Sequence, residues 1–185
     1  MTDPAARHAW VHLIGALALI VLLIEWITLY RIVGPLTGYF LPQMHFGAFT
    51  SGDLFTFAAE LSNNQDRFDL YERFLQWVDP VFILLFCLWL FKAMRPRLLA
   101  LAALLCFAML DLAENALLLY YLGDLRMVLI VAEASDAPAL DAAMQDPTVL
   151  FLSYITSAKL ALGVLSAAYT IGSGIVNRSR TKVAP

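Results

Sequence analysis

Apolar residues run in four long blocks along this chain, and the polar residues gather in the stretches between them. The blocks cover residues 9–30, 74–91, 98–122 and 148–176, close to or above the roughly 20 residues that one helical crossing of a bilayer requires. This pattern predicts an all-α integral membrane protein whose four transmembrane helices form one bundle. No linker between domains is evident, so we expect a single membrane domain over residues 1–185.

The connection between the first two blocks, residues 33–73, carries a pattern of its own. A Ser-Gly-Asp sequence at residues 51–53 offers capping groups, and apolar residues follow with polar residues between them. This predicts a short amphipathic helix, which lies either on the membrane surface, the simpler expectation, or over the mouth of the bundle. The second long connection, residues 123–147, ends in Asp146 and Pro147, which predict an N-cap and a first helical residue for the fourth span.

Composition supports a membrane protein and excludes several other classes. Apolar residues make up 61% of the chain and charged residues 15%, far from the half and the quarter that are typical of soluble domains. The net charge of −3 comes with no basic stripe that would indicate a nucleic-acid partner. The first block is too long for a cleaved signal segment and is expected to be a retained span. Both cysteines fall inside apolar blocks, where we expect buried thiols rather than a disulfide.

Basic residues predict how the bundle is oriented. The tight connection between the second and third blocks contains Lys92, Arg95 and Arg97, and further basic residues precede the first block and follow the fourth. Under the positive-inside rule, this side faces the cytoplasm together with both termini. The opposite side holds most of the acidic residues. We therefore expect a multi-pass protein of the bacterial inner (cytoplasmic) membrane, with residues 33–73 and 123–147 as its outer loops.

The third block contains polar residues where a lipid-facing helix would carry none. Asp111, Glu114 and Asn115 are three and four residues apart, so they share one face of the helix. Carboxylates at this depth are costly and usually face a bundle interior or a water-filled cavity. We expect this face to form one wall of an intramembrane site, in which Glu114 and Asp111 are candidate catalytic residues and Asn115 is a candidate ligand-binding residue.

The other spans contribute charges at similar depths. At 1.5 Å per residue, Lys159 and Asp111 both lie about 16 Å below the outer ends of their spans, which predicts an ion pair between them. Glu25 and Asp79 lie about 8 Å below the outer ends of theirs and are expected at the rim of the same site. Lys159, Glu25 and Asp79 thus join Asn115 as candidate ligand-binding residues. Since the inner halves of the spans are almost wholly apolar, the site is expected to open on the outer face, beneath the first loop.

Asp79 precedes Pro80, and the pair has two interpretations. As an N-cap and a first helical residue, they would leave only residues 81–92 for the crossing, which is too short. Alternatively, a helix that starts near Asp66 runs through this point and kinks at Pro80, which fits the required length better. Whether Asp79 serves as a cap or as a site residue stays open at this level.

The cofactor question also stays open. No histidine lies among the acids, and no haem, zinc or nucleotide signature is visible, but carboxylates with Asn115 suit a hard cation such as Mg²⁺ or Ca²⁺. His8 and His12 have the spacing of a metal pair, but they lie at the far end of the first span and are expected at the interface. Seven aromatic residues are expected in interfacial belts: Trp10, Trp26, Tyr30, Tyr71, Trp77, Tyr120 and Tyr121.

Three elements in order along the chain resemble a group of small, uncharacterised bacterial four-span membrane proteins: Asp79-Pro80 in the second span, Asp111-x-x-Glu114-Asn115 in the third and Lys159 in the fourth. The resemblance covers residues 66–168, and the D-x-x-E-N element is its most specific part. It implies a shared architecture and a shared polar site but no reaction.

Several functions fit these observations. In the first, an outward-facing intramembrane acidic pocket binds a lipid, amphipathic or cationic small molecule. In the second, an intramembrane enzyme acts on a lipid or isoprenoid, with Glu114 transferring a proton, Asp111 ionised by Lys159 and Asn115 as the orienting partner. In the third, a structural or assembly protein uses the buried ion pair only to fix helix register. The expected partners are the lipid bilayer, a lipid or amphipathic ligand and, as an open question, further copies in a homo-oligomer.

Overall fold

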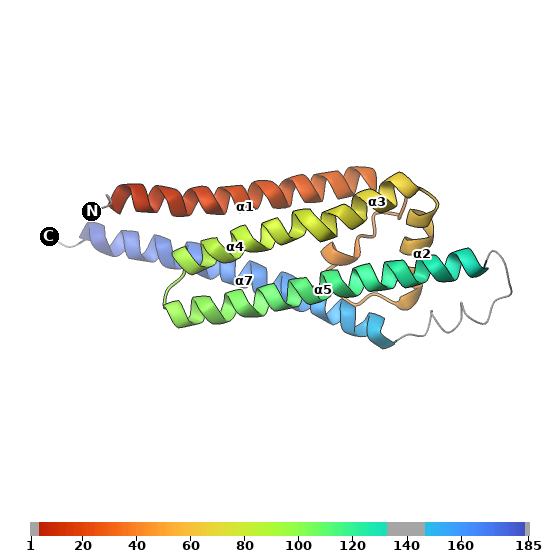
Figure 1. The fold of residues 1–185 in the computed structure, drawn as a ribbon. Coiled ribbons are helices and arrows are strands. Elements are labelled where there is room, and N and C mark those ends of the chain that lie inside the picture. The colour runs from red at the N-terminus through yellow and green to blue at the C-terminus, as the bar shows by residue number, and fades with distance from the viewer. Residues whose placement is uncertain (1–3, 133–146, 184–185) are drawn as a thin grey trace.

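Figure 1 shows the computed structural model, which describes residues 4–132 and 147–183, with side chains described for residues 9–125 and 149–173. No strand occurs among the described residues, so the all-helical class is confirmed. The elements, in chain order, are α1 (Pro4–Ile32), the 3₁₀ turn η1 (Pro42–Met44), α2 (Ser51–Ser62), α3 (Gln65–Arg73), the π-helical turn η2 (Phe74–Val78), α4 (Asp79–Ala93), α5 (Arg97–Ala132) and α7 (Pro147–Val183).

Four stretches are long and apolar enough to cross a membrane, and they match the four predicted spans. They are Ala9–Ile32, Gln65–Ala93, Arg97–Leu125 and Val149–Ser173. The protein is therefore a multi-pass membrane protein built as a four-helix bundle. The second outer loop was predicted to start at residue 123, but α5 continues to Ala132. Residues 133–146, with the predicted N-cap Asp146, lie outside the described residues, and α7 begins at Pro147.

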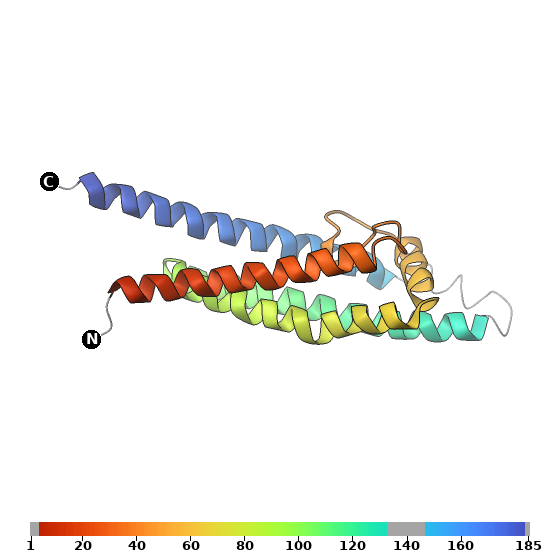
Figure 2. The same cartoon turned by 90° about the horizontal axis from the view of Figure 1, so that it is seen from above.

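The four long helices form an incomplete ring. α1 packs on α4, α4 on α5 and α5 on α7, whereas α1 and α7 make almost no direct contact in the described part of the chain. α1 begins and α7 ends at one end of the bundle, which we call the terminal end, and α2 and α3 lie at the opposite, loop end (Figure 1). Seen from above, α1 and α7 diverge toward the terminal end (Figure 2).

The second span is one helical stretch that begins at Gln65, as the second interpretation of Asp79-Pro80 predicted. The distortion takes the form of a π-helical turn rather than a simple kink. The N–H of Asp79 donates to the carbonyl of Phe74, one residue further back than in an α-helix, and Pro80 has no N–H to donate. Asp79 thus lies inside a continuous helix and is not an exposed cap.

The connection between α1 and α3 folds back onto the loop end of the bundle. A capping box starts α2: the Thr50 hydroxyl accepts from the Asp53 N–H at 3.2 Å, and the Asp53 carboxylate accepts from the Thr50 N–H at 2.7 Å. The predicted amphipathic helix therefore exists, but the expectation that it simply lies on the membrane surface is wrong. Its apolar residues are buried in the largest hydrophobic cluster of the protein, together with side chains of α1, α3, α5 and α7: Leu54, Phe57, Ala58 and Leu61.

Candidate functional site

Lys159 and two carboxylates of α5 form a buried ionic cluster. The Lys159 Nζ lies 2.7 Å from Asp111 Oδ1, which confirms the predicted ion pair, and it also pairs with Glu114 Oε2. The Thr156 hydroxyl, one turn before Lys159 on α7, donates a hydrogen bond to Glu114 Oε1. Both carboxylate side chains are fully buried. The cluster therefore ties α5 to α7 and uses the single ammonium group for two carboxylates.

Asn115 links the same helix to the second span. Its Nδ2 lies 2.6 Å from Asp79 Oδ2 and 3.5 Å from the carbonyl oxygen of Leu75. The Leu75 carbonyl would ordinarily accept from the N–H of Asp79, but the π-helical turn commits that N–H to Phe74. Asn115 thus supplies a donor that the distorted backbone needs, while it also holds the Asp79 carboxylate in place.

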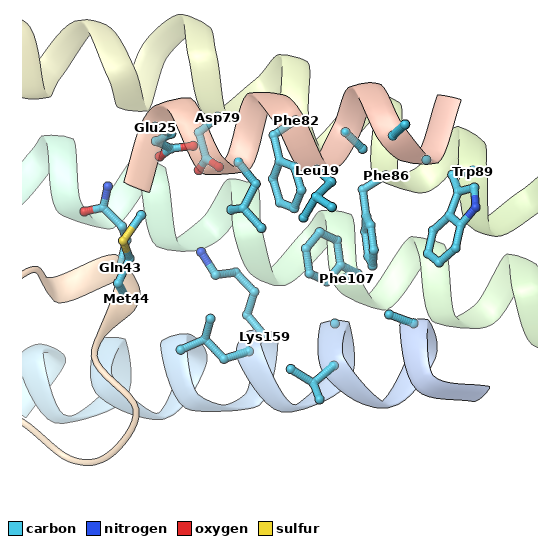
Figure 3. Close-up of a pocket in the computed structure, with 18 of the residues that line it drawn as sticks. Leu19, Glu25, Gln43, Met44, Asp79, Phe82, Phe86, Trp89, Phe107 and Lys159 are labelled. Carbon is cyan, nitrogen blue, oxygen red and sulfur yellow. The ribbon is translucent and has the colours of Figure 1, made fainter. Parts of the chain in front are cut away.

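Glu25 of α1 lies next to Asp79 of the second span. The two carboxyl groups lie close enough for their charges to interact and are turned toward each other (Figure 3). Both residues are buried, with 2% and 4% of their surface exposed. Glu25 Oε2 has no hydrogen-bond partner among the described residues. The structure thus brings every predicted site residue into two adjoining groups, Lys159-Asp111-Glu114 and Glu25-Asp79-Asn115.

Two polar residues complete this region and were missed in the sequence. Gln43, in η1, is buried next to Glu25, and its Oε1 accepts a hydrogen bond from the Tyr71 hydroxyl. Tyr71 and Tyr121 are buried, so their expected place in an interfacial belt is wrong, whereas Trp77 is exposed. No periodic pattern marks Gln43, and only the folding of its loop places it here.

A cavity of about 540 Å³ begins at the Glu25-Asp79 pair and runs along the bundle toward the terminal end. α1 and α7 form its two walls, and rings from α4 and α5 form its floor (Figure 3). The polar residues at its loop end are Glu25, Gln43, Asp79 and Lys159, and the aromatic residues of the floor are Phe82, Phe86, Trp89 and Phe107. Asp111, Glu114 and Asn115 are not among the lining residues of this cavity.

The expectation that the site opens beneath the first loop is wrong. Gln43 and Met44 line the loop end of the cavity, and Leu41 and Phe49 are buried behind them in the hydrophobic cluster. The hydrogen bond from the Gly47 N–H to the Ser157 hydroxyl, at 3.2 Å, ties the same connection to α7. Glu25 and Asp79 accordingly lie at the closed end of the cavity rather than at its rim.

The charges at the closed end do not balance. Four carboxyl groups face one ammonium group, and Lys159 is already shared by Asp111 and Glu114. An ionised carboxylate that is buried without a positive partner costs several kcal/mol, so this end of the cavity favours a cationic group. Among the described residues, no three His, Cys, Asp or Glu side chains converge as metal ligands do. A metal-ligand set for Mg²⁺ or Ca²⁺ is therefore not found in this part of the chain.

The remaining candidates lie away from the acids. His12 lines the terminal end of the cavity, and the His8 side chain lies outside the described set. Cys87 is buried and Cys106 is exposed on α5, so the expectation of two buried thiols holds for Cys87 alone. No family of known proteins, curated protein or solved structure matches the chain.

Replacing Asn115 with leucine is expected to lower the free energy of unfolding by about 1.5–3 kcal/mol, because Asp79 and the Leu75 carbonyl lose a buried donor. Unfolding by sodium dodecyl sulfate in mixed micelles measures the change. In the double variant Asn115→Leu/Asp79→Leu, the loss should be smaller, because the carboxylate that would lack its donor is removed as well. Equal unfolding of Asn115→Leu and the wild type would show that this contact contributes nothing.

Proposed function

We propose that the protein binds a membrane-dissolved amphiphile that has a small cationic head and a hydrocarbon tail. The observation that carries this proposal is the cavity, which is apolar along its length and has Glu25 and Asp79 at its closed end. Its volume of about 540 Å³ falls within the range of small-molecule sites, which are mostly apolar with a few convergent polar groups.

The surplus of carboxyl groups favours a cationic head. A protonated amine would neutralise the Glu25-Asp79 pair and give the unpartnered Glu25 Oε2 a donor. An anionic head, such as a phosphate or a fatty-acid carboxylate, would add negative charge beside Glu25 and Asp79 where little water is present to screen it. The head must also be small, because η1 closes the cavity directly beyond Glu25.

The seam between α1 and α7 offers a route from the bilayer. These two helices make almost no contact in the described residues, and the cavity between them lies within the candidate membrane spans. A ligand dissolved in the membrane can therefore enter sideways without crossing water. We place the protein in the bacterial cytoplasmic membrane with the loop end outside, as the basic turn at Lys92, Arg95 and Arg97 indicates.

A reaction at the closed end is the second candidate function. Two adjoining carboxyl groups in an apolar cavity can divide the roles of acid and base. Glu25 and Asp79 reach the cavity, whereas Glu114 and Asp111 are buried against Lys159, so the acid and base would be Glu25 and Asp79. Membrane lipids from cells with the wild type and with Asp79→Asn test this candidate, and identical lipid profiles would contradict it.

Binding is tested with n-dodecylamine in nanodiscs of phosphatidylcholine. At about 100 times Kd, ligand linkage predicts a rise in Tm of about 5 °C or more. Dodecanol should raise the Tm less, and dodecyl sulfate should not raise it at all. In Glu25→Gln, the difference between the amine and the alcohol should fall, whereas Glu60→Gln, at an exposed position of α2, should behave as the wild type does. Equal responses to amine and alcohol in the wild type would contradict a cationic site.

A further inference from the structure

The apolar part of the cavity is long. Its lining on α1 extends from His12 to Glu25, which corresponds to about 20 Å along the helix axis. Apolar side chains of all four spans line it over this length, so it suits a hydrocarbon chain that runs along the bundle.

An aromatic ring of α4 lies against α1 near the terminal end of the cavity. A Cβ atom on Gly15 of α1 would lie 2.7 Å from Trp89 Nε1, so the Trp89 ring lies directly against the backbone of α1. The distance from this contact back to the acids is the same on both helices. Gly15 precedes Glu25 by about 15 Å on α1, and Trp89 follows Asp79 by about 15 Å on α4.

A second ring narrows the path one turn below Lys159. A Cβ atom on Gly163 of α7 would lie 3.1 Å from Phe107 Cε2, so the Phe107 ring packs on the backbone of α7 at this glycine. Phe107 in turn lies beside Phe86, with ring centroids 4.8 Å apart. Gly163 also lines the cavity, so any larger residue there would fill part of it or displace Phe107.

Resting on the proposed binding function, we infer that the ligand is an amine whose hydrocarbon chain runs from the Glu25-Asp79 pair to Trp89. Gly163 lies along this path, and Trp89 sets the preferred chain length. At about 1.2 Å per bond of an extended chain, the 15 Å between the acids and Trp89 corresponds to about twelve carbons.

The test compares n-octylamine, n-dodecylamine and n-hexadecylamine by the Tm of the whole protein in phosphatidylcholine nanodiscs. For the wild type, the rise in Tm should be largest with dodecylamine. In Trp89→Ala, the maximum should move to hexadecylamine. A response that is independent of chain length would overturn the inference while leaving the proposed function intact. If no amine raises the Tm, the proposed function fails instead.

Two matched glycine variants on α7 separate a blocked path from a damaged fold. Gly163→Leu should reduce the response to dodecylamine at least tenfold in apparent Kd. Gly172→Leu should respond as the wild type does, because a Cβ atom there meets nothing within 4 Å. Gly163→Ala, a milder change, should give an intermediate Kd and guards against the unfolding of the leucine variant. Unchanged affinity in Gly163→Ala and in folded Gly163→Leu would overturn the proposed path.

Discussion

Replacing Lys159 with methionine should destabilise the protein by about 3–5 kcal/mol, the usual cost of leaving buried charges without their partner. The ammonium group lies 2.7 Å from Asp111 Oδ1 and also pairs with Glu114, and both carboxylates are fully buried on α5. Methionine nearly preserves the volume and the apolar stem, so packing along the cavity wall should change little. The loss measured by unfolding in mixed micelles would therefore report the charge rather than a void.

The control for this experiment removes the carboxylates as well. In the triple variant Lys159→Met/Asp111→Asn/Glu114→Gln, stability should return to within about 1–2 kcal/mol of the wild type, since replacing a whole buried ionic group is often close to neutral. Replacing only Lys159 and Asp111 should not restore it, because Glu114 would remain unpaired. Lys92→Met, at an exposed site, should have little effect. A small effect in Lys159→Met would show that water or a proton already compensates the carboxylates.

The polar contacts named above connect neighbouring spans around the bundle. Lys159 joins α7 to α5, and Asn115 joins α5 to the second span. At the loop end, α1 is held by the hydrogen bond from Arg67 Nη1 to the Ile32 carbonyl at 2.7 Å, and toward the terminal end by Trp89 on Gly15. None of these contacts joins α1 to α7. A ligand would thus enter between α1 and α7, the two helices that none of these contacts connects.

The parts of this arrangement that depend on helical periodicity could be predicted from the sequence. Spacings of three and four residues placed Asp111, Glu114 and Asn115 on one face, and the rise per residue placed Lys159 level with Asp111. The same depth count put Glu25 and Asp79 near the site, because straight helices of similar length keep their residues in register across a bundle. These inferences needed only local geometry and the high cost of charge in a membrane.

The parts that depend on long-range folding could not be predicted. Gln43 and Tyr71 enter the site because the first loop turns inward, and no periodicity in residues 33–50 encodes that turn. The position of the cavity depends on which pair of helices stays apart, and all four spans have similar apolar surfaces. The prediction that the site opens toward the first loop failed for this reason, since depth along a span says nothing about what closes its end.

The closure at the loop end provides the second large expected effect. Phe57 of α2 is 1% exposed and stacks edge-on against Tyr71, with ring centroids 5.1 Å apart, and against Phe40, at 6.0 Å. Phe57→Ala should cost about 3–5 kcal/mol of the free energy of unfolding, because it leaves a cavity in the hydrophobic cluster that holds the loop. Unfolding in mixed micelles measures this loss.

The matched control is Phe46→Ala in the same connection, where the ring is 72% exposed and the expected change is within about 0.5 kcal/mol. The two variants also separate closure from global stability. In Phe57→Ala, the ring behind Tyr71 is lost, so the hydrogen bond from Tyr71 to Gln43 should loosen and amide exchange at η1 should rise more than in the core of α5. If exchange rises equally in both places, the loop unfolds only with the whole bundle, and η1 is an integral wall of the site rather than a separable closure.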